Sequence, residues 1–106
     1  MKLLFKTAAP NKLKKDIIAL IEDKSLNTWA IHEDEDTKYL KHTKQWGEKG
    51  VIQLLANSEK KHLSVEVLKF KKEKAEVKDF EGYYLGRFCE IIFVNFATKY
   101  SSIERE

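Results

Sequence analysis

The chain of 106 residues has a single cysteine, Cys89, so it cannot form an internal disulfide bond. It also lacks the glycine-rich phosphate loops, the Gly-x-Ser-x-Gly elbow of serine hydrolases and the His-Glu-x-x-His helix of zinc proteases. His32 and His42 flank an acidic run, but a hairpin there would hold the two imidazoles roughly 13 Å apart, too far to share one ion. We therefore assign no catalytic residue, no metal ligand and no cofactor, and we expect a protein that is not an enzyme.

Arginine is scarce, because only Arg87 and Arg105 accompany eighteen lysines. Proteins that read nucleic acid rely on arginine for bidentate contacts and carry a larger excess of positive charge than the +3 of this chain. Long apolar runs are also missing: the longest nearly uncharged stretch, residues 91–98, is far shorter than the ~20 residues that span a bilayer. Lys6 interrupts the N-terminal apolar residues too early for a secretory signal. We expect a cytoplasmic protein with no membrane partner.

Apolar residues make up 42% of the chain and aromatic residues 11%, which is enough for one packed hydrophobic core. A chain of this length is the size of one ordinary domain and leaves little room for a second core. Charged residues reach 35%, above the usual quarter, and indicate a strongly solvated surface. We therefore expect residues 1–106 to form a single domain.

Two hydrophobic periodicities occur along the chain. Stretches with alternating or continuous apolar residues predict strands, and stretches with apolar residues three and four apart predict helices. The order strand, helix, four strands, helix favours an α+β two-layer sandwich, with a mostly antiparallel sheet of about five strands and both helices packed on one face. The order of the strands within the sheet stays open. The predicted strands are residues 2–8, 28–32, 37–42, 51–56 and 62–70, and the predicted helices are residues 10–24 and 80–103.

The second and third predicted strands flank an acidic turn and are expected to pair as a hairpin. If the hairpin is centred on Glu35, Ile31 lies opposite Tyr39. Trp29 would then share one surface with both of them, as a cross-strand patch of aromatic and β-branched side chains.

Residues 80–103 hold the densest apolar and aromatic content of the chain. Ile91, Val94 and Thr98 lie outside the main apolar stripe, so the predicted helix is apolar on more than one side. A domain of this size rarely has a third layer, and a homodimer or a partner protein would cover the second face. The alternative is a curved sheet that covers most of the helix. The stripe consists of Leu85, Phe88, Cys89, Ile92, Phe96, Tyr100 and Ile103, and the residues expected at the interface are Tyr84, Ile91, Val94 and Thr98.

Gly82 and Gly86 stand four residues apart at the start of this helix, where each costs about 1 kcal/mol relative to alanine. One interpretation is that they let a ligand approach, with Arg87 and the free amides of the helix start holding an anion. The other is that Gly82 ends a loop and Gly86 packs flat against the sheet. The residues considered for ligand contact are Trp29, Trp46, Gly82, Gly86 and Arg87.

Several lysines could form a basic edge, although glutamates interleave with them and lysine is also common on solvated sheet edges. They are Lys60, Lys61, Lys69, Lys71 and Lys72.

Three functional hypotheses follow from these sequence features. The leading one is a small binding module that self-associates through its last helix. The second is weak binding of nucleic acid or another polyanion at the lysine edge. The third is a small-ligand pocket near the Trp46 loop.

Overall fold

The computed structural model describes residues 1–44, 49–70 and 80–106. Trp46, Lys71 and Lys72 lie outside these ranges, so the hypotheses that involve them stay predictions. The elements in chain order are β1 (Lys2–Lys6), α1 (Pro10–Glu22), β2 (Trp29–Asp34), β3 (Thr37–His42), β4 (Gly50–Asn57), β5 (His62–Lys69), α2 (Phe80–Asn95) and β6 (Ser102–Arg105).

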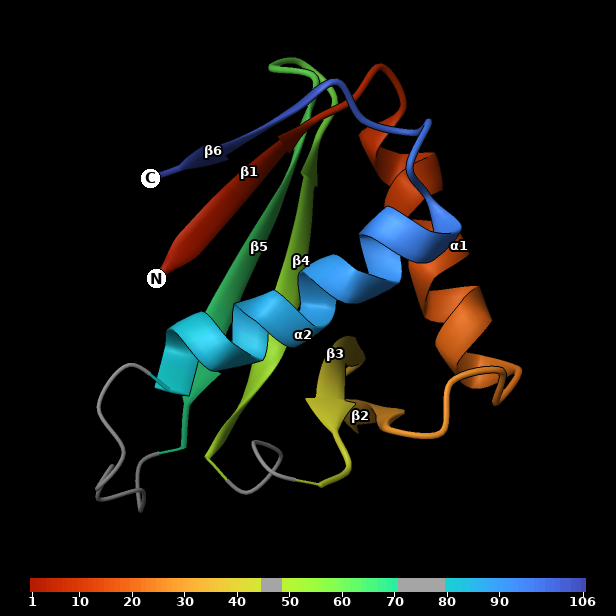
Figure 1. Ribbon diagram of the computed structural model, residues 1–106, viewed down its shortest axis with the longest axis vertical. Helices are drawn as coiled ribbons and strands as arrows, with labels where there is room; N and C mark the ends of the chain where they lie inside the picture. The colour runs from red at the N-terminus through yellow and green to blue at the C-terminus, as the bar shows by residue number, and fades with distance from the viewer. Residues whose placement is uncertain (45–48, 71–79) are drawn as a thin grey trace.

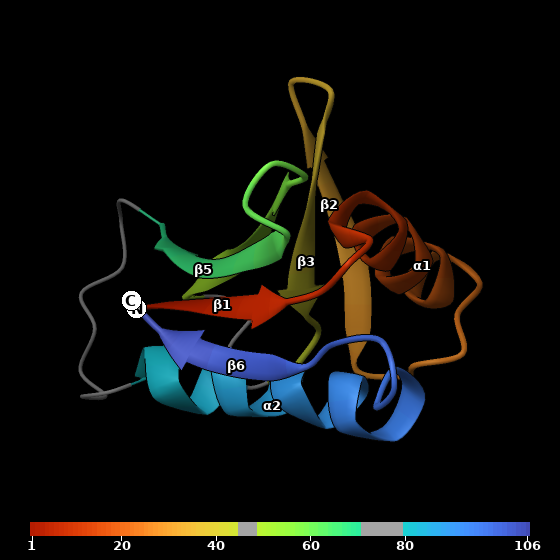
Figure 2. The same ribbon diagram turned by 90° about the horizontal axis from the view of Figure 1, so that it is seen from above.

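Within the described ranges, the strands form one six-stranded sheet in the order β2-β3-β4-β5-β1-β6, and every pairing is antiparallel. Helix α2 crosses over β4 and β5, and α1 packs beside it at the β2 side of the sheet (Figures 1 and 2). Side chains of both helices join one hydrophobic cluster with the inward-facing residues of the strands. This arrangement confirms the predicted α+β two-layer sandwich with an antiparallel sheet.

Helix α1 follows directly from its sequence. Pro10 occupies the first turn, where its fixed φ suits a helix and its missing N–H costs nothing. Leu13, Ile17 and Ile21 are buried at four-residue spacing and form the single stripe that packs on the sheet.

The C-terminal strand β6 is a correction to the predicted helix at 80–103, which ends eight residues early at Asn95. After a turn, the backbone N–H of Ser101 donates to the carbonyl of Lys6 at 2.8 Å, and Ile103 then lies opposite Phe5 on β1. Tyr100 still reaches the core, with its ring centroid 5.6 Å from that of Phe5. The apolar spacing that suggested a longer helix therefore comes from a turn and a strand that approach the same core.

The hairpin register predicted from the sequence is wrong by one residue. Glu35 and Asp36 both have positive φ, 47° and 65°, so the connection is a two-residue turn of the type that matches the twist of a hairpin. Ile31 consequently lies opposite Leu40, not opposite Tyr39. Because side chains alternate along a strand, Tyr39 falls on the face of the sheet that points away from the helices.

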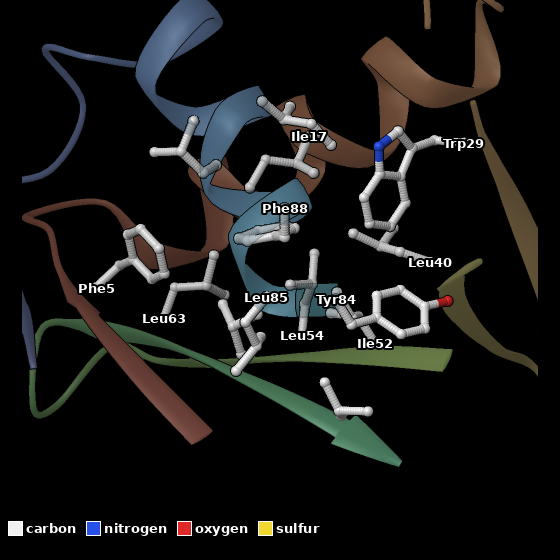
Figure 3. Packing of buried hydrophobic residues seen from close by; sticks show 14 of the residues in the cluster. Phe5, Ile17, Trp29, Leu40, Ile52, Leu54, Leu63, Tyr84, Leu85 and Phe88 are labelled. Carbon is white, nitrogen blue, oxygen red and sulfur yellow. The ribbon is translucent and has the colours of Figure 1, made fainter. Parts of the chain in front are cut away.

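The hydrophobic core lies between the helices and the sheet, with Phe88 of α2 near its centre (Figure 3). The Phe88 ring is fully buried and meets the Phe5 ring edge-on at 5.9 Å between centroids. The other face of the sheet carries partly exposed side chains such as Leu55, which is 49% exposed. The core consists of Phe5, Leu13, Ile17, Ile21, Trp29, Leu40, Ile52, Leu54, Leu63, Val65, Val67, Phe80, Tyr84, Leu85, Phe88, Ile91, Ile92 and Phe96.

Candidate interaction surface and adjoining hollow on helix α2

The sequence-predicted interface residues divide between the inside and the outside of the molecule. Tyr84 is fully buried and Ile91 is only 5% exposed, so both belong to the protein's own core. The expectation that they face a partner is therefore corrected, because the protein's own residues cover both side chains. Val94, by contrast, is 80% exposed, and Thr98 is also exposed.

The solvent-facing side of α2 is unusually apolar for an exposed helix surface. Tyr83 is 59% exposed and Phe93 is 52% exposed, and together with Val94 they are three of the five large apolar side chains recorded as exposed in the described ranges. Tyr83 lies ten residues before Phe93 and eleven before Val94, which is about three turns at ~3.6 residues per turn, so the three lie along one side of the helix. We call this side the outer α2 face, and it consists of Tyr83, Gly86, Arg87, Glu90, Phe93 and Val94.

Gly86 lies in the middle of the outer α2 face and has no packing role within the described part of the chain. A Cβ atom added there would meet no heavy atom within 4 Å. The expectation that Gly86 packs flat against the sheet is therefore wrong. A Cβ atom added at Gly82 would have the Met1 terminal methyl as its nearest heavy atom, at 3.9 Å, which is an ordinary van der Waals contact. Within residues 1–44, 49–70 and 80–106, neither glycine relieves a close contact, although each is unfavourable in a helix.

Two opposite charges occupy the centre of the outer α2 face. The Arg87 guanidinium donates from Nη1 to Glu90 Oε1 at 3.0 Å, one turn along the helix. Both side chains are about half exposed or more, at 49% and 63%, so this ion pair contributes little stability by itself. Its position matters more than its energy, because it puts one cation and one anion between the apolar residues.

Arg87 and Glu90 also border a hollow of about 430 Å³ between α2, the start of β2 and the end of β3. Two of the five residues considered for ligand contact, Trp29 and Arg87, meet here, whereas Gly82 and Gly86 do not line it. Trp46 lies outside the described residues. The remaining lining residues, which the sequence analysis did not select, are Thr28, His42, Lys44 and Glu90.

His42 is the most deeply buried polar residue of this hollow, with 5% of its surface exposed. Its ring meets the Trp29 indole edge-on at 5.2 Å between centroids. Burial lowers the pKa of His42, the Arg87 and Lys44 charges lower it further, and the Glu90 charge opposes them. The imidazole is consequently neutral at pH 7. Its alternation with Leu40 along β3 was the one sequence signal that could have predicted its inward position.

Tyr84 joins the two strand ends beside the hollow. The backbone N–H of His42 donates to the Tyr84 hydroxyl at 2.9 Å, and that hydroxyl donates to the Gly50 carbonyl at 2.9 Å. Burial raises the pKa of Tyr84 to about 12, so the phenol stays protonated and can donate. Tyr84 therefore holds β3 to β4, which is a structural role and not an interface role.

The lysines of the predicted basic edge are separated in space. Lys60 and Lys61 lie in the turn before β5, and Lys69 is the last residue of that strand, about 26 Å beyond Lys61 at ~3.3 Å per residue. The Lys69 ammonium lies over the Phe80 ring, 5.7 Å from its centroid. The described lysines thus do not make one continuous edge.

No protein-family model, no curated protein and no solved structure matches this chain. Among residues 1–44, 49–70 and 80–106, no group of three or more histidine, cysteine or acidic side chains is placed to hold a metal ion. No helix in the same ranges is long and apolar enough to cross a membrane. Cys89 is half-buried against the core, and burial raises the pKa of its thiol.

Proposed function

We propose that this protein is a small binding module that self-associates through the outer α2 face. The observation that carries the proposal is the combination of three exposed large side chains, Tyr83, Phe93 and Val94, with an unpacked glycine between them. Large apolar side chains exposed on one side of a helix are typical of interaction sites. A glycine in a helix costs stability, and close approach by another backbone would offset that cost.

The order of side chains on the outer α2 face suits a second copy of the same helix. The face begins and ends with an apolar side chain, Tyr83 and Val94. Between them lie one cation, Arg87, and one anion, Glu90. When two copies of α2 run antiparallel with a twofold axis midway between positions 88 and 89, Arg87 lies opposite the second copy's Glu90. Tyr83 then lies opposite the second copy's Val94, and each contact occurs twice. The face is therefore complementary to itself in both charge and apolarity.

Gly86 falls beside this axis in the antiparallel arrangement, where the two helix backbones would be closest. The absence of a side chain there leaves space for the second copy's Glu90 to lie across the helix. A second copy gives a role to five of the six residues of the face, Tyr83, Gly86, Arg87, Glu90 and Val94, which is why we prefer a second copy to an unrelated partner.

Substitution of Val94 by glutamate is expected to convert a dimer into a folded monomer. The 80% exposed Val94 supports no internal packing, so the fold should be unchanged, whereas each dimer would bury two unpaired carboxylates. The measurement is the solution mass by light scattering across a dilution series, together with circular dichroism to show that the variant is folded.

The matched control is Leu55→Glu, which places the same charge at an exposed leucine of β4, away from α2. This variant should keep the mass of the unmodified protein. A monomeric mass for the unmodified chain at all concentrations would reject the proposal, and so would a Val94→Glu protein that still forms dimers.

A further inference from the structure

The hollow beside the outer α2 face is lined mainly by hydrogen-bond donors. Arg87 uses Nη1 for Glu90, which leaves its other guanidinium N–H groups for a ligand. Lys44 adds an exposed ammonium group and Thr28 adds a hydroxyl. Against these stands one carboxylate, that of Glu90, which already accepts from Arg87. The surplus of donors and of positive charge favours an anion over a cation.

His42 contributes a further donor. The backbone N–H of Lys44 lies 3.4 Å from His42 Nδ1, which accepts its proton, so in the neutral ring the hydrogen is assigned to Nε2. An imidazole whose Nδ1 is held by its own strand end can donate from Nε2 to a ligand that accepts hydrogen bonds.

The wall of the hollow is aromatic as well as polar. Trp29 is almost fully buried, and its indole packs against both the His42 ring and the Tyr84 ring, at 5.2 Å and 5.9 Å between centroids. These contacts fix the indole in place, so the wall is rigid. A rigid apolar wall next to convergent donors suits a molecule with a flat apolar body and one anionic end.

We propose that this hollow binds a small organic carboxylate, with the carboxylate held by Arg87, Lys44 and His42 and the apolar body against Trp29. The approximately 430 Å³ volume is in the range of metabolite-sized pockets. Arg87 and Glu90 belong both to this hollow and to the outer α2 face, so ligand binding and self-association use two of the same side chains.

The test is a titration of isotope-labelled protein with benzoate, followed by NMR, with neutral benzamide and inorganic phosphate as comparison probes. Benzoate is expected to cause saturable shifts at the Trp29 indole N–H, the Arg87 Nε–H and the His42 ring, and benzamide is expected to cause none. Shifts spread evenly over surface lysines would overturn the site. Equal shifts at these three groups with inorganic phosphate would overturn the assignment to an organic ligand.

Two variants locate the binding. Arg87→Gln should weaken benzoate binding about tenfold, because a charge-assisted hydrogen bond is lost. Lys60→Gln, which removes a positive charge in the β4–β5 turn, should leave the affinity unchanged. An Arg87→Gln affinity equal to that of the unmodified protein would refute the proposal. Repeating the titration with Phe93→Glu, which changes the outer α2 face at a residue that does not line the hollow, should still give saturable binding. This variant keeps the result separate from dimer formation, in which Arg87 would contact the second copy's Glu90.

The affinity should also depend on pH through His42. A bound carboxylate favours the charged imidazolium and so raises the pKa of His42 above its value in the free protein, where burial, Arg87 and Lys44 lower it and Glu90 opposes them. Benzoate should therefore bind more tightly as pH falls from 7 towards 5.5, while the His42 ring titrates at higher pH in the complex. An affinity that is constant over this range would contradict a contact between the ligand and His42.

Discussion

Replacement of Phe88 by alanine is expected to lower the free energy of unfolding by about 3–5 kcal/mol. The ring is fully buried, lies 5.9 Å from the Phe5 ring centroid and 6.5 Å from that of Trp29, and connects α2 to both β1 and β2. Removing it leaves a cavity that neither strand can close without breaking its own pairing. Because small domains are stable by only about 5–15 kcal/mol, the variant should unfold at markedly lower denaturant concentration.

The same substitution five residues later provides the matched control. Phe93 belongs to the same helix but is 52% exposed, so Phe93→Ala should change the stability of the monomer by no more than about 0.5 kcal/mol. Both variants are best compared by urea unfolding in the Val94→Glu background, where self-association does not contribute. A loss at Phe93 as large as that at Phe88 would contradict the assignment of inner and outer sides of α2.

Gly50→Ala is the second substitution with a large expected effect, a loss of about 3 kcal/mol. A Cβ atom at this position would lie 2.3 Å from the Leu68 carbonyl oxygen on the neighbouring strand, and a backbone atom cannot move aside as a flexible side chain can. Any shift would also disturb the Gly50 carbonyl that accepts the Tyr84 hydroxyl. Thermal unfolding followed by circular dichroism measures the effect.

Gly86→Ala should act in the opposite direction, although it is the same chemical change. Its Cβ meets nothing within 4 Å, and alanine is favoured over glycine in a helix by about 1 kcal/mol. The monomer should therefore become more stable. If Gly50→Ala were tolerated, or if Gly86→Ala destabilised the monomer, the environments described for these two glycines would be wrong.

The sequence was sufficient to predict the fold class because its hydrophobic periods are clear. Leu13, Ile17 and Ile21 at four-residue spacing predict α1, and the alternation of Leu63, Val65 and Val67 predicts β5. Hydrophobic periodicity does not indicate which strands pair when they are far apart in the sequence. The spacing of Ile103 matches the apolar stripe of α2, but in the structure Ile103 belongs to a sixth strand that pairs with the edge of β1.

The one-residue error in the predicted register of the β2–β3 hairpin has a local cause, which is the geometry of the turn. Periodicity alone does not distinguish a turn centred on one residue from a turn between two residues. The outcome depended on two consecutive non-glycine residues, Glu35 and Asp36, adopting positive φ. That conformation is uncommon and has no strong signal in this sequence, so the register shifted by one and Tyr39 changed face.

The candidate surface was only partly predictable for a related reason. A helix that is apolar nearly all round indicates burial on several sides, but how the helix packs on the rest of the fold decides which apolar residues stay exposed. Tyr84 and Ile91 are buried in the folded protein, whereas Val94 is exposed. The hollow at His42 was less predictable still, because it depends on three segments that meet only after folding.

The most direct test of self-association through the outer α2 face is a charge exchange between Arg87 and Glu90. In the antiparallel arrangement, Arg87→Glu alone sets two anions opposite each other, and Glu90→Arg alone sets two cations opposite each other. Each variant should dimerise about tenfold more weakly than the unmodified protein at low salt.

An equimolar mixture of the two variants restores opposite charges at every cross-helix contact. Light scattering should therefore show dimers in the mixture at concentrations where each variant alone is mostly monomeric. A mixture whose mass is simply the average of the two separate proteins would contradict the antiparallel, self-complementary use of this face.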